Sequence, residues 1–160
     1  MASSPVADLF AAATRRDALR FAGLAALATL SACGPVQAAP RKIKWGRDTC
    51  EFCHMTFADR RFAAEVWDPT TERARIYDDF GCAVLASTEA GTADRDDVPF
   101  WVSDDDVADV WLDARTAHYR NDSVTPMGYA HSAGHTPAYT LAFRAAVAAI
   151  RDKAACEHHA

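Results

Sequence analysis

A short apolar run near the N-terminus limits how much of this chain is available to fold. Residues 21–30 are a run of ten mostly apolar residues that follows the paired arginines Arg15 and Arg16. A helix needs about 20 residues to cross a bilayer core, so this run is too short for a permanent span. A basic region before a short apolar region is typical of a signal peptide. We therefore expect residues 1–32 to be a twin-arginine-type export signal, which leaves 128 residues to fold.

The end of this signal indicates a lipid anchor. Leu30-Ser31-Ala32-Cys33-Gly34 is similar to the bacterial lipobox, in which the cysteine is acylated and becomes the new N-terminus. We expect lipidation at Cys33 and a periplasmic location on a cell membrane, with the choice between inner and outer membrane left open. Residues 33–45 are expected to be the lipidated tether, 46–153 the folded domain and 154–160 a flexible tail.

Composition excludes one class of partner. Seventeen basic and twenty-two acidic residues give a net charge of -5, which falls to -6 without the three Arg and two Asp of residues 1–32. Proteins that bind nucleic acid through its phosphates need clustered Lys and Arg, so no nucleic-acid partner is expected. Half of the residues are hydrophobic, which is enough for a packed core.

Alternating apolar residues and turn residues predict an α+β fold with small antiparallel sheets and helices packed on them. Strands are expected at 61–68, 74–77 and 98–103, with a turn at 69–72, and residues 110–119 suggest a broken hairpin or a bulged strand. Asp78 and Asp79 can cap a helix over 80–87, which Gly91 ends. A loop is expected at 121–136 and an amphipathic helix at 138–153.

Soft metal ligands are concentrated in one segment. Cys50, Cys53, His54 and Met55 lie within six positions of each other. Thiolate and thioether sulfur suit Cu(I), which accepts two or three ligands, whereas zinc usually takes four, mostly Cys and His. If residues 53–55 are extended, Cys53 and Met55 point to the same side and both sulfurs can bind one ion. The segment therefore predicts a Cu(I) site.

The spacing of Cys50 and Cys53 also fits a disulfide or a redox pair. No strand leads into a helix that begins at this motif, as a thioredoxin-type fold requires. A thiol–disulfide oxidoreductase acting on a copper-protein client, and a structural lipoprotein with a permanent bridge, remain as alternatives. The sequence contains no nucleophile motif, phosphate-binding glycine loop or dinucleotide fingerprint, so an enzyme is not expected.

A second region, residues 123–135, carries Met127, His131 and His135. It can bring a third ligand to the ion, although core packing for Met127 and solvent exposure for the two histidines are the commoner roles. Cys82 lies among apolar residues of the expected helix, which favours a buried and inert thiol.

Several of these motifs occur in one order that resembles the NosL family, the nitrous oxide reductase accessory lipoproteins. They are the lipobox, Cys50-x-x-Cys53-x-Met55, Asp59-x-x-Phe62-Ala63-Ala64-Glu65, Asp78-Asp79-Phe80-Gly81-Cys82 and Thr125-Pro126-Met127-Gly128. The resemblance runs from about residue 50 to residue 150.

The resemblance implies a function and partners. It implies a periplasmic copper chaperone of small ββα-type units, with two related halves as one arrangement, that supplies Cu(I) for the copper–sulfide centre of nitrous oxide reductase. The implied partners are that reductase and its ABC-type maturation complex. Cys53 and Met55 match the family's sulfur ligands and Met127 matches its Pro-Met-Gly loop, while the third ligand stays open between Met127, His54 and a loop histidine.

Overall fold

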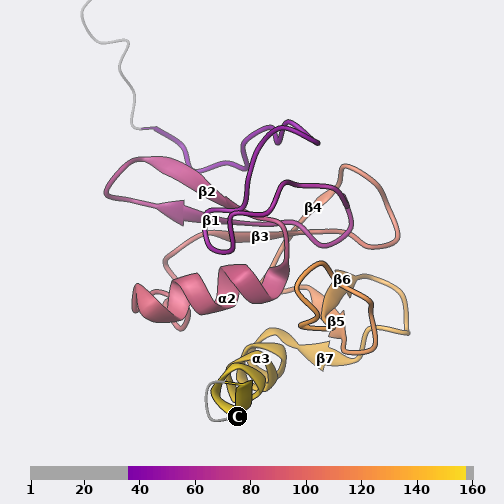
Figure 1. Cartoon of the computed structure of the whole chain (residues 1–160). Helices are drawn as coiled ribbons and strands as arrows, with labels where there is room; N and C mark the ends of the chain where they lie inside the picture. Colours follow the sequence, from indigo (N-terminus) through magenta and orange to yellow (C-terminus); the bar gives the residue numbers. More distant parts are fainter. Residues whose placement is uncertain (1–35, 158–160) are drawn as a thin grey trace, which may run out of the picture. The chain divides into compact units, whose positions relative to one another are not determined.

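The computed structural model describes residues 36–157, which form two small antiparallel sheets and two helices (Figure 1). This confirms the predicted α+β class. The predicted export signal and Cys33 lie outside the described residues. The described elements, in chain order, are β1 (Ala64–Asp68), β2 (Arg73–Tyr77), α2 (Phe80–Glu89), β3 (Phe100–Ser103), β4 (Trp111–Asp113), β5 (His118–Arg120), β6 (Ser132–Gly134), β7 (Leu141–Ala142) and α3 (Phe143–Glu157).

The larger sheet has the strand order β2-β1-β3-β4, and every pair in it is antiparallel. Its first hairpin pairs Ala64 with Tyr77 and Asp68 with Arg73, around the turn that the sequence predicts. Successive strand residues face opposite sides of a sheet. Figure 1 shows α2 on one side of this sheet and the chain segment that precedes β1 on the other.

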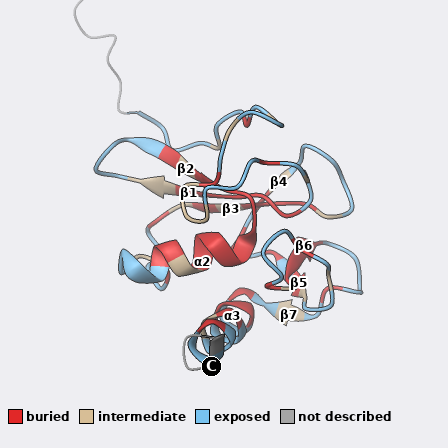
Figure 2. Ribbon diagram, in the orientation of Figure 1, coloured by how far each residue is buried: buried red, intermediate tan, exposed pale blue. Residues whose placement is uncertain are grey.

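Four buried aromatic rings join the two sheets and both helices. Phe80, the first residue of α2, stacks on Tyr119 of β5 with ring centroids 4.7 Å apart, and lies 5.8 Å from Phe100 of β3 and 6.2 Å from Phe143 of α3. Buried residues therefore line the inner side of α2, as Figure 2 shows. Because Phe80 is fixed by three elements, the start of α2 is held firmly, and this is where the candidate site lies.

The packed domain extends beyond both expected boundaries. Ile43 is part of the buried core, with 4 % of its surface exposed. The backbone N–H of Arg41 donates to Oε2 of Glu65 at 2.7 Å. The tether expected at 33–45 therefore includes residues that pack on the sheet. At the other end, α3 continues to Glu157 and buries Ala154, so its last residues are not the flexible tail expected from 154 onward.

Three local expectations were wrong. Residues 111–113 and 118–120 are not one bulged strand, because β4 joins the first sheet and β5 joins the second, whose order is β6-β5-β7. The expected loop at 121–136 contains β6, and the last helix begins at Phe143, after the two residues of β7. These strands have two or three residues each, so whether they form depends on the strands they pair with rather than on their own strand propensity.

Among residues 36–157, neither helix is long and apolar enough to cross a bilayer.

Candidate metal centre

The Cys50–Met55 segment is a closed turn. The N–H of Cys50 donates to the carbonyl of Met55 at 2.8 Å, and the N–H of His54 donates to the carbonyl of Cys50 at 3.1 Å. A bridge between Thr49 and Thr56 closes the base of the turn. His54 has a φ of 65°, so the backbone reverses there. The backbone from Cys53 to Met55 is therefore not extended, and strand alternation does not place their side chains.

Glu51 fixes this turn to the edge strand of the sheet. Its backbone N–H donates to the carbonyl of Ile76 at 2.9 Å, and its carboxylate accepts hydrogen bonds from Arg73 at 2.8 Å and Arg75 at 3.1 Å. Burial pushes the pKa of Glu51 up, but the two guanidinium groups lower it overall. Because Ile76 lies two residues before Asp78, this clamp sets the cysteine turn beside the link between β2 and α2.

That link contains two buried aspartates, one of which caps α2 while the other contacts Cys53. Asp79 is the N-cap of α2, and its Oδ1 accepts the N–H of Gly81 at 2.7 Å, as the sequence predicts. Asp78 is 2 % exposed and its Oδ1 accepts a hydrogen bond from the Cys53 thiol at 3.3 Å. Cys82 is in the first turn of the same helix, and it is fully buried.

The turn, the link and the helix bring four potential ligands together. The sulfurs of Cys50, Cys53 and Cys82 and a carboxylate oxygen of Asp78 all lie within 4.8 Å of one another. With a metal–sulfur distance of about 2.3 Å, two sulfurs on one ion are about 3.8 Å apart in a tetrahedral site and about 4.6 Å apart in a linear one. Movements of about 1 Å or less would therefore close these groups on a single ion, and the cluster could bind a metal.

The cluster favours one thiolate even without an ion. A hydrogen bond from the Cys82 thiol lowers the pKa of Cys50 to about 4, against the opposing effect of burial, and the backbone N–H groups of Cys53, Asp78 and Phe52 add to it. Burial, and then the hydrogen bond to Cys50, raises the pKa of Cys53, and the hydrogen bond to Cys50 raises that of Cys82. Burial raises the pKa of Asp78 to about 6. Among the three thiols, these contacts favour the anion of Cys50.

The Met127 loop is attached to the same link. The N–H of Met127 donates to Oδ2 of Asp79 at 2.9 Å, so one carboxylate holds both the start of α2 and this loop. The loop also packs directly on the helix, because a Cβ on Gly81 would lie 2.2 Å from the ring of Tyr129. Met127 is 36 % exposed, so it does not fill the core, and Met55 is 48 % exposed at the end of the cysteine turn.

The histidines are placed differently from one another. His54 is exposed in the cysteine turn, and His135 is exposed with its Nε2 at 3.7 Å from Asp104. His131 is buried, although solvent exposure is the commoner role for such a residue: its Nδ1 lies 2.6 Å from the carbonyl of Tyr129, and its Nε2 has no hydrogen-bond partner among the described residues. Burial lowers its pKa.

The sequence predicts half of the ligand cluster. It singles out Cys50 and Cys53, which the structure brings together as free thiols. It treats Cys82 as an inert core thiol and Asp78 as a cap or a solvated turn residue. Cys82 is buried as expected, but it lies beside Cys50, and Asp78 faces the thiols rather than solvent. The Asp78-to-Cys82 block of the family resemblance is the one sequence signal that pointed to both residues.

No family model, no curated protein and no solved structure matches this chain.

Proposed function

We propose that this protein is a Cu(I) chaperone of the NosL type, which carries one cuprous ion as cargo on Cys50, Cys53 and Cys82. The observation that carries the proposal is the meeting of three thiol sulfurs within 4.8 Å at the start of α2. Thiolates are soft ligands, and soft ligands favour Cu(I) over hard cations such as Mg²⁺ or Ca²⁺. Before loading, Asp78 accepts the hydrogen bond of the Cys53 thiol, whose proton is released when Cys53 binds the ion as a thiolate.

Copper is proposed over zinc because of the numbers and kinds of ligands. Three sulfurs satisfy a three-coordinate cuprous ion, whereas zinc needs a fourth ligand, which here would be the Asp78 carboxylate. Met55 ends the cysteine turn and Met127 is hydrogen-bonded through its N–H to Asp79, and both side chains are partly exposed. A thioether binds Cu(I) but is a poor zinc ligand. Met55, Met127 and His54 remain candidates for an additional ligand during transfer.

The exposure of the three thiols supports release of the ion to another protein. Cys50 and Cys82 are fully buried, whereas Cys53 is partly exposed. Cys53 therefore offers an acceptor thiolate a way to the ion, beside the exposed residues His54 and Met55. Stepwise exchange would begin with the Cys53 bond, while Cys50 and Cys82 still hold the ion.

The client and location follow from the sequence resemblance. We propose nitrous oxide reductase and its ABC-type maturation complex as the partners, and a periplasmic location with a lipid anchor at Cys33. An accessory protein that loads copper needs a site that is strong enough to withhold the ion from solution and open enough to release it. A buried pair of thiols with one accessible thiol meets both needs.

The direct test is anaerobic titration of the reduced full chain with Cu(I) in competition with a cuprous chelator. The variants Cys50→Ser, Cys53→Ser and Cys82→Ser should each lose affinity by more than about tenfold, because even outer-shell changes at metal sites cost that much. Cys156→Ser is the matched control, since Cys156 is an exposed thiol in α3. Unchanged affinity in the first three variants, or preferential retention of Zn²⁺ over Cu(I), would reject the proposal.

The alternative of a thiol–disulfide oxidoreductase is less well supported by the geometry. Such an enzyme attacks its substrate with an accessible thiolate. Here Cys50 has the lowered pKa but is fully buried, and the accessible Cys53 has a raised pKa. Reduction of an insulin disulfide by the protein would nevertheless establish this activity, and the copper titration would then be expected to fail.

A further inference from the structure

Charge is distributed very unevenly along the folded part of the chain. Residues 36–61 contain six basic and three acidic residues, whereas residues 62–160 contain eight basic and seventeen acidic ones. Figure 1 shows much of the first segment on the side of the larger sheet opposite α2, while its Cys50–Met55 turn reaches the start of α2. An otherwise acidic protein therefore has a net basic segment on this side of the larger sheet.

Some of these cations are not neutralised by neighbouring carboxylates. Arg41 pairs with Asp48 at 3.1 Å, Arg60 with Asp109 at 2.7 Å and Arg61 with Asp59 at 2.7 Å. The side chains of Lys42 and Arg47 form no ion pair within the part of the chain that the structure describes, and both residues are exposed. Surplus positive charge thus remains after the local pairs are counted.

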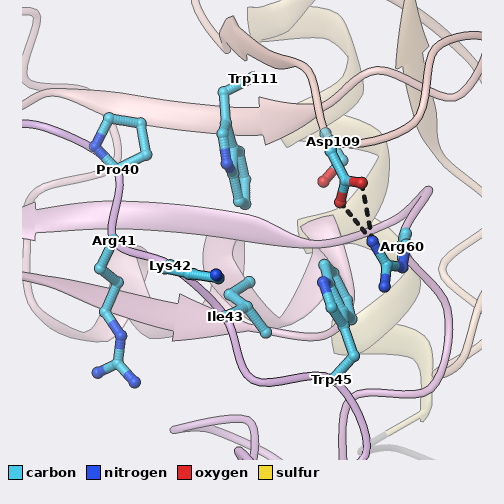
Figure 3. Close-up of a pocket in the computed structure, with 9 residues that line it drawn as sticks. Pro40, Arg41, Lys42, Ile43, Trp45, Arg60, Asp109 and Trp111 are labelled. Atoms are coloured by element: carbon cyan, nitrogen blue, oxygen red, sulfur yellow. Dashed lines mark hydrogen bonds and ion pairs between the residues drawn. The ribbon is translucent and has the colours of Figure 1, made fainter.

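Two tryptophans border a groove on this face. The groove has a volume of about 560 Å³, and its lining includes Arg41, Lys42, Trp45, Arg60 and Trp111. Figure 3 shows the two indoles on opposite sides of the groove, with Arg41 and Lys42 toward one end and the Arg60–Asp109 pair toward the other. The Arg60 guanidinium lies 5.2 Å from the centre of the Trp45 ring. Both indoles are partly exposed rather than buried in the core.

We propose that this basic face, defined by Arg41, Lys42, Lys44, Trp45, Arg47 and Trp111, binds the surface of an anionic phospholipid bilayer. Partly exposed tryptophans beside lysine and arginine are the combination that settles at a membrane interface, where indoles lie at headgroup level and cations meet lipid phosphates. The occupant of the groove would be phospholipid headgroups. The acidic remainder of the domain would be repelled by the same surface, so binding also sets an orientation.

The length of chain before this face agrees with a bilayer as the partner. Only seven positions separate Cys33 from Pro40. Seven residues span at most about 25 Å even when fully extended. An acyl group on Cys33 would therefore keep the basic face close to the lipid surface, although the charges and indoles would bind lipid without that anchor.

The first test measures binding of the full chain carrying Cys33→Ser, which removes the acylation site, to phosphatidylcholine vesicles with and without phosphatidylglycerol. The double variant Lys42→Gln/Lys44→Gln should lower binding to the anionic vesicles by roughly thirtyfold, because each cation near such a surface contributes about a factor of five. The matched control is Arg120→Gln/Arg144→Gln, which removes the same charge from β5 and α3. Equal losses in both variants, or no loss in the first, would overturn the proposal.

The second test reads the orientation directly. The four tryptophans of the chain are at positions 45, 67, 101 and 111. Lipids brominated in their acyl chains quench indoles that contact the bilayer, so quenching should fall in Trp45→Phe and Trp111→Phe and persist in Trp67→Phe and Trp101→Phe. Loss of quenching in the second pair alone would place another face on the membrane and contradict the proposal. Copper binding is measured separately and is expected to be normal in all of these variants.

Discussion

Glu65 offers a quantitative test of how the sheet holds the N-terminal segment. This residue of β1 is fully buried. Its Oε2 accepts the N–H of Arg41 at 2.7 Å, and its Oε1 has no hydrogen-bond partner among the described residues. A single hydrogen bond does not offset the hydration that a carboxylate loses when it is buried. Burial accordingly raises the pKa of Glu65 to about 7, although the Arg41 hydrogen bond opposes the shift.

The sign of the resulting pH dependence follows from linkage. Between the ordinary value of 4.5 and about 7, the unfolded chain has an ionised Glu65 while the folded chain keeps it protonated. The folded state therefore binds more protons, and stability falls as the pH rises through this window. One pKa unit corresponds to about 1.4 kcal/mol, so the contribution lost by pH 8 is about 3 kcal/mol.

The variant Glu65→Gln resembles the protonated residue and should lack this contribution to the pH dependence. We expect the free energy of unfolding in urea, followed by tryptophan fluorescence, to fall by about 3 kcal/mol more in the parent protein than in the variant between pH 4.5 and pH 8. Other carboxyl groups titrate in both proteins and cancel in the difference. Parallel pH profiles for the two proteins would refute the reasoning about Glu65.

Three further predictions concern the site. Saturating Cu(I), at about 100 times its dissociation constant, should raise the free energy of unfolding by about 3 kcal/mol, and Cys82→Ser should reduce this gain in the same urea titration. Gly81→Ala should destabilise the protein by about 1–3 kcal/mol, because the new methyl group would overlap the Tyr129 ring; unchanged urea unfolding would show that the loop moves freely. Oxidation that joins Cys50 to Cys53 should abolish copper loading until a reductant is added, and equal loading of both forms in a chelator assay would contradict the thiolate site.

Local signals accounted for most of the first half of the fold. The alternation from Ala64 to Tyr77 with its central turn predicted the first hairpin, and Asp79 marked the start of α2 at its true position. Both features depend on residues close in sequence. By contrast, β6 is the sequence Ser-Ala-Gly, which has low strand propensity, and it exists because β5 pairs with it. No local pattern could have predicted that strand.

The candidate site shows the same division between local and distant information. Cys50 and Cys53 were found because they lie three residues apart. Cys82 joins them only because Glu51 clamps the cysteine turn to β2 and because Phe80 anchors the first turn of α2 in the aromatic cluster. That juxtaposition depends on packing between residues some thirty positions apart. Strand alternation does not place the Cys53 and Met55 side chains, since the backbone reverses at His54, and their joint role as ligands stays a prediction.

X-ray absorption at the copper edge of the anaerobically loaded protein tests the central claim most directly. We predict a cuprous ion with three sulfur neighbours at about 2.2–2.3 Å. In Cys82→Ser the sulfur count should fall to two, whereas Cys156→Ser should give the parent spectrum. A first shell made mainly of nitrogen or oxygen, or a spectrum that Cys82→Ser leaves unchanged, would contradict a copper site built from these three thiols.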